Sequence, residues 1–352
     1  MATLAEKETT KTLTTHYIDG EFVESHGREV MDIIKPTNGK LIARVTLGDE
    51  EDTKRAIAAA KCAFVTYGRS AKEERLHHLQ QLHKAVSARV DDLTAVMVEE
   101  YGGVARFARL IVESGISAFA AAEKALRDMR IKESWGKTTV TMEPVGVAGL
   151  ITAWNANALF ICLKLSSAVA AGCTVVLKPS EMSSLQTRVM VEALNAAGLP
   201  KGVFNVVTGL GTVVGAELVR NPDVAKISFT GSVAVGQAIM RDGAATMKRV
   251  TLELGGKSPT IVLDDAALDK AVPAALTLAF MNSGQACAAG TRLLVPTSRL
   301  DEVKRVIRDE MRAYTVGDPA DPNIMVGPMV SQKQYERVES YIRKGIDRKS
   351  TV

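Results

Sequence analysis

Between residues 145 and 255 the sequence alternates between short apolar runs and helical segments. The runs are VGVAGLIT, TVVLK, VFNVVTG, AKISFTG and RVTLELG, and Gly172 and Gly198 end the first two intervening helices. Short, continuously apolar strands joined by helices predict a parallel sheet with helices on both faces, an α/β Rossmann-like fold. In such a fold ligands bind at the carboxyl ends of the strands.

The flanking segments have other patterns. Residues 49–102 predict three helices, and Leu76, Leu79, Leu82 and Val86 recur at a helical period in the second. Residues 131–145 alternate around Gly136, which predicts a hairpin that is either a surface ribbon or a strand pair for another subunit. A second strand–helix alternation fills residues 258–317, and a last helix covers residues 330–345. The sequence therefore predicts a second, incomplete α/β part.

Composition excludes several classes of protein. A hydrophobic share of 46% with a net charge of +4 argues against disorder and gives no reason to expect nucleic acid as a partner. The four cysteines form no CxxC pair and no zinc spacing, and the N-terminus lacks the apolar core of a secretory signal, so we expect a reduced, cytoplasmic protein without metal. The uncharged stretch from Pro144 to Leu163 holds Trp154, Asn155 and Asn157, which disfavours a membrane span.

Three strand ends carry residues that suit a nucleotide. Lys178-Pro179-Ser180-Glu181 follows the second strand, Gly209-Leu210-Gly211 with Gly215 follows the third, and Phe229-Thr230-Gly231-Ser232 follows the fourth. Glycines between a strand and a helix let the backbone approach a phosphate, and a carboxylate at a strand end can accept hydrogen bonds from ribose hydroxyls. Each segment alone is better explained as a helix-starting turn. Their occurrence in consecutive units predicts a nucleotide site.

Three further residues have unusual settings. Cys287 in NSGQACAAGTR has small neighbours that leave room for a substrate, although a lone cysteine is more often a small buried hydrophobe. Glu253 lies on the otherwise apolar strand TLELG, where it is either paired structurally or poised as a base. Asn155 in AWN is either a turn-capping residue or an amide donor for an oxyanion.

The segments TAWN, LKPSE, ISFTGS, LELGGKSP and NSGQACAAGTR, in this order, resemble the NAD(P)-dependent aldehyde dehydrogenases over about residues 17–347. The resemblance implies that Cys287 adds to an aldehyde and that Asn155 and the Cys287 backbone N–H hold the oxyanion. It also implies that Glu253 activates the water that hydrolyses a thioester. The family's regions imply an N-terminal helical part of the NAD-binding domain at 1–126, an oligomerisation hairpin at 127–143, the NAD-binding domain at 144–254 and a truncated catalytic domain at 255–352.

The resemblance also implies a cofactor site. Ile151 to Trp154 would line the nucleotide, Lys178 and Glu181 would bind the adenosine ribose, and Glu181 favours NAD over NADP. The residues implied to contact the cofactor are Ile151, Thr152, Ala153, Trp154, Lys178, Ser180, Glu181, Gly211, Gly215, Phe229, Thr230, Gly231, Ser232, Val235, Leu254 and Gly255. The implied partners are a small-molecule aldehyde and, if the hairpin pairs between subunits, further copies of the chain.

The sequence departs from the family at two places. Ala153 replaces the usual proline before Trp154, and NANALFICLKL is atypical for the aldehyde entrance, so the aldehyde itself is not predicted. Family members continue far beyond Asp347, where RKSTV ends this sequence, and we expect a C-terminally truncated member. Three functions stay open: a working dehydrogenase, an inactive NAD-binding remnant, and a thiol esterase without hydride transfer.

Overall fold

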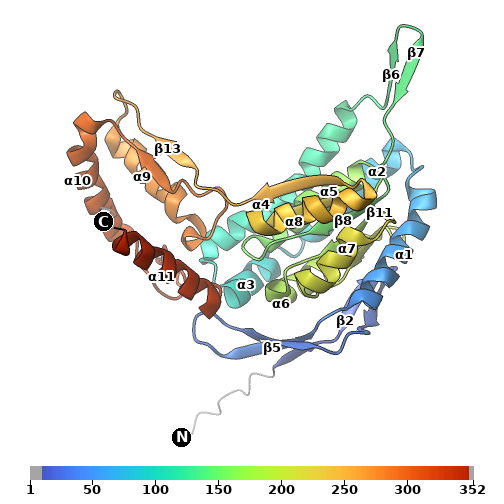
Figure 1. Cartoon of the computed structure of the whole chain (residues 1–352), viewed down its shortest axis with the longest axis horizontal. Helices are drawn as coiled ribbons and strands as arrows, with labels where there is room; N and C mark the ends of the chain where they lie inside the picture. Colours follow the sequence, from blue (N-terminus) through green and yellow to red (C-terminus); the bar gives the residue numbers. More distant parts are fainter. Residues whose placement is uncertain (1–9, 349–352) are drawn as a thin grey trace, which may run out of the picture. The chain divides into compact units, whose positions relative to one another are not determined.

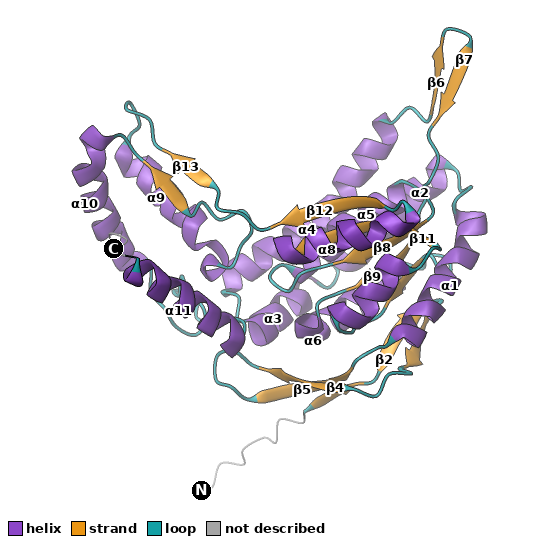
Figure 2. Cartoon of the chain, in the orientation of Figure 1, coloured by secondary structure: helices purple, strands orange, loops and turns teal. Residues whose placement is uncertain are grey.

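The computed structural model describes residues 10–348, so the terminal RKSTV, apart from Arg348, lies outside the described residues. The chain forms two compact units. The first contains the described residues up to Ile33, then Ile42–Val96 and Arg109–Leu254, and the second contains Ile34–Leu41, Met97–Ala108 and the described residues from Gly255 onward. Figure 1 labels the elements of both units, and Figure 2 colours them by type.

The first unit is built on a seven-stranded sheet within the described residues, in the order β12-β11-β8-β9-β10-β2-β3. The strands are β2 (Thr15–Ile18), β3 (Glu21–Glu24), β8 (Val147–Ile151), β9 (Thr174–Lys178), β10 (Phe204–Val206), β11 (Val224–Gly231) and β12 (Arg249–Leu254). Strands β8 to β12 pair in parallel, and β2 and β3 add an antiparallel edge. The expected five strands and the parallel sheet are therefore confirmed. The chain reverses its direction of winding between β8 and β11, which is where doubly wound sheets bind ligands.

Helices cover both faces of this sheet. One face packs against α1 (Glu50–Tyr67), α7 (Ala216–Arg220) and α8 (Val233–Gly243), through a core that includes Ile57, Leu218 and Ile239. The other face packs against α2 (Lys72–Ser87), α4 (Ala105–Asp128), α5 (Asn157–Ala170) and α6 (Ser184–Ala196), through a core that includes Phe119 and Ile161. Residues of the central strands β8 and β9 enter both cores, as strands covered on both faces require.

The N-terminal region differs from its expected helical character. Strands β1 (Lys11–Leu13), β4 (Val30–Ile34) and β5 (Leu41–Thr46) form a second sheet, and β2 and β3 join the main one before the first helix begins. These strands are short and half-exposed, so their apolar residues gave no clear alternation. Helix α3 (Val90–Tyr101) precedes α4. The expected hairpin is present as β6 (Lys132–Trp135) and β7 (Thr138–Thr141), and Figure 1 shows it extending away from the main sheet.

A buried aspartate joins the N-terminal strands to α1. Asp52 is fully buried and accepts hydrogen bonds from the Ser25 hydroxyl at 3.1 Å, the His26 N–H at 3.0 Å and the Gly27 N–H at 3.1 Å. Burial alone would raise the pKa of Asp52, but these donors and His16 outweigh it and hold the pKa well below the usual range. Asp49 caps the same helix, accepting from the backbone N–H groups of Glu51 and Asp52.

The second unit contains a two-stranded parallel sheet, β13 (Pro259–Ile261) and β14 (Arg292–Leu294). Helices α9 (Leu268–Phe280) and α10 (Leu300–Glu310) pack on it through Val272, Leu276 and Val303, and α11 (Gln332–Asp347) is the last helix. The expected second alternation is therefore present. The described chain also has short helical turns: 3-10 turns at Glu181–Ser183, Ala244–Thr246, Met281–Gly284, Thr297–Arg299 and Met311–Ala313, and a π-helical turn at Gly211–Gly215.

Candidate functional site

The carboxyl ends of the central strands bring most of the expected site residues together in the first unit. Ile151, the last residue of β8, is paired in register with Lys178 of β9 and with Phe229 of β11. Glu253 and Leu254 of β12 are paired with Thr230 and Gly231 of β11. The strand ends that the sequence marked separately therefore form one continuous edge, at the point where the winding direction reverses.

Lys178 and Glu181 form a pair at this edge. The Lys178 side chain is 5% exposed, and its Nζ donates to Glu181 Oε2 and to the Pro179 carbonyl, both at 3.0 Å. Ser180 begins the following turn, where its hydroxyl accepts from the Met182 N–H. An ammonium and a carboxylate held side by side present both a donor and an acceptor, which suits ribose hydroxyls.

Two glycine-containing turns lie beyond β10 and β11. Gly211 and Gly215 bound the π-helical turn, and a methyl group added at Gly211 would meet no atom within 4 Å. At Gly231 such a group would lie 2.4 Å from the Phe229 ring, so a larger residue there would require the ring to shift. Ser232 caps α8 by accepting from the N–H of Val235. The π-turn and the N-terminus of α8 both leave backbone surface open toward the carboxyl edge.

Two threonine hydroxyls at the same edge lack partners. Thr152 is 4% exposed and Thr230 is 6% exposed, and neither hydroxyl has a hydrogen-bond partner among residues 10–348. Burying a hydroxyl without a partner costs about 1–3 kcal/mol. The edge therefore contains two buried hydroxyls that make no hydrogen bond within the described residues, and a bound ligand could supply their partners.

Asn155 and Glu253 both belong to the first unit. Asn155 lies in the turn between β8 and α5, and Ser183 Oγ donates to the carbonyl of its neighbour Trp154 at 3.4 Å. Glu253 is exposed on β12, whose outward residues alternate with those that pack against α8. The other residues of the turn, Ile151 to Trp154, pass from buried to half-exposed toward Asn155.

The sequence analysis missed Lys164. This lysine lies on α5, is 7% exposed, and donates from Nζ to Ser228 Oγ at 2.9 Å. Burial lowers the pKa of Lys164 to about 8, against the opposing effect of the Glu253 carboxylate. A lysine within the apolar run FICLKL was the available signal, because a charge there must be either paired or functional.

Cys287 belongs to the second unit, and Gly255 opens that unit's last segment. The Cys287 thiol is exposed and forms no disulfide, and it lies in a turn that follows the 3-10 segment Met281–Gly284. Asn282 and Ser283 have positive φ values of 53° and 57°, and Gly284 follows at 73°. A non-glycine residue in this region costs on the order of 1–2 kcal/mol, so the turn before the thiol is strained.

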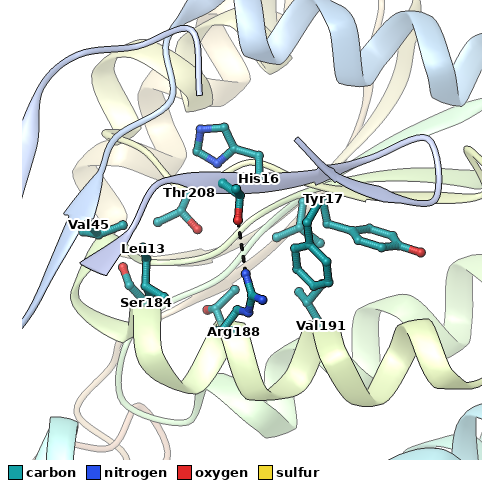
Figure 3. Close-up of a pocket in the computed structure, with 12 residues that line it drawn as sticks. Leu13, His16, Tyr17, Val45, Ser184, Arg188, Val191 and Thr208 are labelled. Carbon is teal, nitrogen blue, oxygen red and sulfur yellow. Dashed lines mark hydrogen bonds between the residues drawn. The ribbon is translucent and has the colours of Figure 1, made fainter. Parts of the chain in front are cut away.

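A small pocket elsewhere in the first unit lies between β2 and α6 (Figure 3). It contains no expected site residue. Its charged group, Arg188, donates to Thr15 Oγ1 at 3.1 Å and to Glu192 Oε1 at 2.7 Å. Since Arg188 is already paired, the pocket is a weaker candidate than the sheet edge. Residues 10–348 also contain no cluster of three or more metal-ligating side chains, and none of their helices has the length and apolar character of a membrane span.

The sheet, its winding and the strand-end residues define an α/β protein of the dinucleotide-binding type. A model of the aldehyde dehydrogenase family matches residues 22–352. The chain is 41% identical over 332 residues to a 3-succinoylsemialdehyde-pyridine dehydrogenase of a Pseudomonas species, covering 94% of this chain and 70% of that protein. It is 38% identical to a putative aldehyde dehydrogenase of Staphylococcus saprophyticus, covering 96% and 71%. The chain belongs to the aldehyde dehydrogenase family.

Solved structures agree with this assignment. A cysteine-to-alanine variant of aldehyde dehydrogenase C from Pseudomonas syringae, in complex with NAD+ and octanal, superposes with a TM-score of 0.94 at 36% identity, covering 97% of this chain and 71% of that one. A betaine aldehyde dehydrogenase from Staphylococcus aureus in complex with NAD+ gives 0.90 at 32% identity, covering 94% and 67%. These matches confirm the expected family and fold, and the chain spans about 70% of the curated relatives' length.

Proposed function

We propose that the protein oxidises an aldehyde to a carboxylic acid with NAD, through a thiohemiacetal and a thioester on Cys287. The observation that carries the proposal is the sheet edge at which Ile151 is in register with Lys178 and Phe229, and Thr230 with Glu253. The family membership and the NAD+ complexes of two structural relatives support it. On this proposal residues 144–254 hold the NAD site and the Cys287 region supplies the nucleophile.

The residues at the edge fit NAD. Lys178 and Glu181 would bind the adenosine ribose, and the Glu181 carboxylate would repel a 2′-phosphate, which favours NAD over NADP. Gly211, Gly215 and Gly231 would admit the adenine and pyrophosphate close to the backbone. The unpaired hydroxyls of Thr152 and Thr230 offer further hydrogen bonds to such a ligand. The remaining proposed contacts are Ile151, Ala153, Trp154, Ser180, Phe229, Ser232, Val235, Leu254 and Gly255.

Each catalytic side chain has one task in this proposal. The Cys287 thiolate adds to the aldehyde carbon, and the Asn155 amide and the Cys287 backbone N–H donate to the resulting oxyanion. When bound, the nicotinamide supplies the acceptor for the hydride whose loss converts the thiohemiacetal to a thioester. Glu253 then takes a proton from the water that attacks the thioester, which releases the acid and restores the thiol.

The deciding experiment replaces Cys287 by alanine and follows NADH absorbance with an aldehyde panel. We expect the Cys287→Ala variant to lose aldehyde-dependent NADH formation completely. Cys62→Ala is the matched control, because Cys62 is the other exposed cysteine among residues 10–348. Equal rates in the parent and the Cys287→Ala variant, or no rate in the parent with any aldehyde, would contradict the proposal.

NAD binding without turnover is the second candidate function. It is favoured because every proposed NAD contact except Gly255 belongs to the first unit, whereas Cys287 belongs to the second. A ligand that binds only the native state must raise the unfolding midpoint. A midpoint raised by NAD in a chain that forms no NADH from any aldehyde would select this second candidate. Release of p-nitrophenol from an ester by such a chain would instead select the thiol esterase.

The β6–β7 hairpin supports a proposal of homo-oligomers. Its residues are almost all exposed, and Trp135 is 67% exposed, which is unusual for a tryptophan. A hairpin that projects from its own sheet can pair with a strand of another copy. Sedimentation should show a smaller species when Trp135 and Val140 are replaced by serine.

A further inference from the structure

We propose that Tyr101 is a positioning residue for Cys287, because its hydroxyl and the Gln285 carboxamide hold the strained turn from which the thiol projects. The inference rests on the proposed role of Cys287 as the nucleophile. All the residues involved belong to the second unit. Tyr101 comes from the end of α3, and the turn lies 181 to 184 residues further along the chain.

The turn cannot hold its conformation by itself. Asn282, Ser283 and Gly284 have consecutive φ values of 53°, 57° and 73°. L-residues avoid this region because Cβ approaches the following carbonyl oxygen, and only single residues visit it routinely. Gly284 adopts it without cost, but two consecutive L-residues, Asn282 and Ser283, persist there only where surrounding contacts impose the conformation. The contacts that impose it here therefore determine where the chain emerges toward Cys287.

Tyr101 supplies one side of the restraint. Its hydroxyl donates to the Asn282 carbonyl at 3.4 Å and accepts from Gln285 Nε2 at 3.3 Å. The side chain is 2% exposed, and burial raises the pKa of Tyr101 far above its ordinary value, so the hydroxyl stays protonated and able to donate. One oxygen thus contacts both ends of the strained segment.

The segment from Gly327 to Val330 supplies the other side. Gln285 Nε2 also donates to the Pro328 carbonyl at 3.3 Å, and Gln285 Oε1 accepts from the Val330 N–H at 3.2 Å. The Gly327 N–H donates to Ser283 Oγ at 2.8 Å. Both polar atoms of the Gln285 carboxamide are therefore engaged, and the side chain connects Tyr101 to this segment.

The position of the turn matters because Cys287 follows Gln285 by two residues. In the proposed reaction the Cys287 backbone N–H donates to the oxyanion, and such a donor works only at about 2.7–3.1 Å from the oxygen. A turn that shifts by a few tenths of an ångström weakens this hydrogen bond without altering the groups that bind the substrate. Loosening the turn should therefore lower kcat and leave KM unchanged.

The test compares Tyr101→Phe with Tyr314→Phe, both in a Cys62→Ala background. Phenylalanine keeps the ring and removes only the hydroxyl, and Tyr314 is a matched tyrosine of the same unit whose hydroxyl pairs with Thr277 Oγ1 at 3.4 Å. The first readout is the alkylation rate of Cys287 by iodoacetamide, with mass spectrometry to identify the modified residue. The second is kcat and KM for NADH formation from an aldehyde, and thermal unfolding verifies the fold.

We expect Tyr101→Phe to raise the alkylation rate of Cys287 about 3- to 10-fold, the factor that corresponds to losing one ordinary hydrogen bond. At the same time kcat should fall by about tenfold at constant KM. A Gln285→Met variant, which also loses the hydrogen bonds to Pro328 and Val330, should change both quantities in the same directions and by at least as much. Adding Tyr101→Phe to Gln285→Met should change them little further, because the two substitutions share the Tyr101–Gln285 contact. Tyr314→Phe should leave both quantities within twofold of the parent.

An alkylation rate for Tyr101→Phe within twofold of the parent would overturn the inference, and so would equal changes in Tyr101→Phe and Tyr314→Phe. If Tyr101→Phe does not unfold cooperatively, Gln285→Met replaces it in the test. The inference is then overturned by an alkylation rate within twofold of the parent or by changes equal to those of Tyr314→Phe. A parent chain without turnover contradicts the proposed function alone. The alkylation rates then decide the inference about Tyr101 without any reference to catalysis.

Discussion

Replacing Asp52 by asparagine should destabilise the protein far more than its conservative character suggests. Both carboxylate oxygens accept from backbone N–H groups: Oδ1 from His26 at 3.0 Å, and Oδ2 from Gly27 at 3.1 Å. Whichever way an asparagine amide is turned, its NH2 group faces one of these donors at that distance. The substitution therefore removes a charge and places an NH2 donor against one backbone N–H donor, at a side chain with no exposure.

The expected loss follows from these contacts. Hydrogen bonds to a charged group contribute about 1.5–3 kcal/mol each, and breaking a buried ionic arrangement costs about 3–5 kcal/mol in total. We expect Asp52→Asn to lose about 3–5 kcal/mol of unfolding free energy in urea titrations followed by circular dichroism. Asp49→Asn is the control in the same helical turn. Asparagine caps helices as well as aspartate does, so we expect a loss of about 1 kcal/mol or less.

The pH dependence gives an independent measure of the same carboxylate. Because the folded-state pKa of Asp52 is depressed, its contribution is present above the unfolded-state value of about 3.9 and is lost as the pH falls through the folded-state pKa. The stability difference between parent and Asp52→Asn should therefore shrink below about pH 4. A loss under about 1 kcal/mol at pH 7, or one no larger than that of Asp49→Asn, would refute this reasoning.

Three further predictions concern other positions. Lys164→Met should remove a gain in stability that the parent shows between pH 7 and 9.5. Burial lowers the folded-state pKa of Lys164 to about 8, so the folded state releases this proton before the unfolded state does and the parent gains about 2 kcal/mol over this range. Urea titrations at the two pH values measure the gain. Gly102→Ala should destabilise more than Gly136→Ala in thermal unfolding; both have positive φ, but only at Gly102 would the methyl group meet Pro328, at 2.6 Å. Ser232→Ala should cost about 1 kcal/mol through the lost cap of α8 and should weaken NAD binding measured by fluorescence titration.

The sequence was most informative where a local pattern and burial agreed. The runs TVVLK and AKISFTG predict strands, and both lie inside the sheet, as β9 and β11. Lys178 ends one of these strands, and Glu181 and Ser232 lie within three residues of a strand end, so their common position at the carboxyl edge was predictable from the parallel topology. Their roles toward NAD, like those of Asn155, Glu253 and Cys287, remain predictions.

The features that the sequence did not reveal depend on distant contacts. Strands β1 to β5 are short and partly exposed, and β2 takes its place only by pairing with β10, nearly two hundred residues away. Lys164 acquires its properties from burial against Ser228, which no spacing within α5 indicates. Tyr101 and Gln285 are 184 residues apart in the sequence, and no local pattern around either residue predicts their hydrogen bond.

The second unit draws its residues from three separate stretches of the chain, since Ile34–Leu41 and Met97–Ala108 join the residues from Gly255 onward. During synthesis the two early stretches leave the ribosome long before Gln285 and Pro328, so Tyr101 and Gly102 can form their native contacts only after most of the chain has been made. Closing such long loops slows folding. A fragment that begins at Gly255 would also lack Tyr101, so cutting the chain at this boundary does not isolate the turn that carries Cys287 in its native surroundings. Any experiment on the reactivity of that thiol has to start from the whole polypeptide.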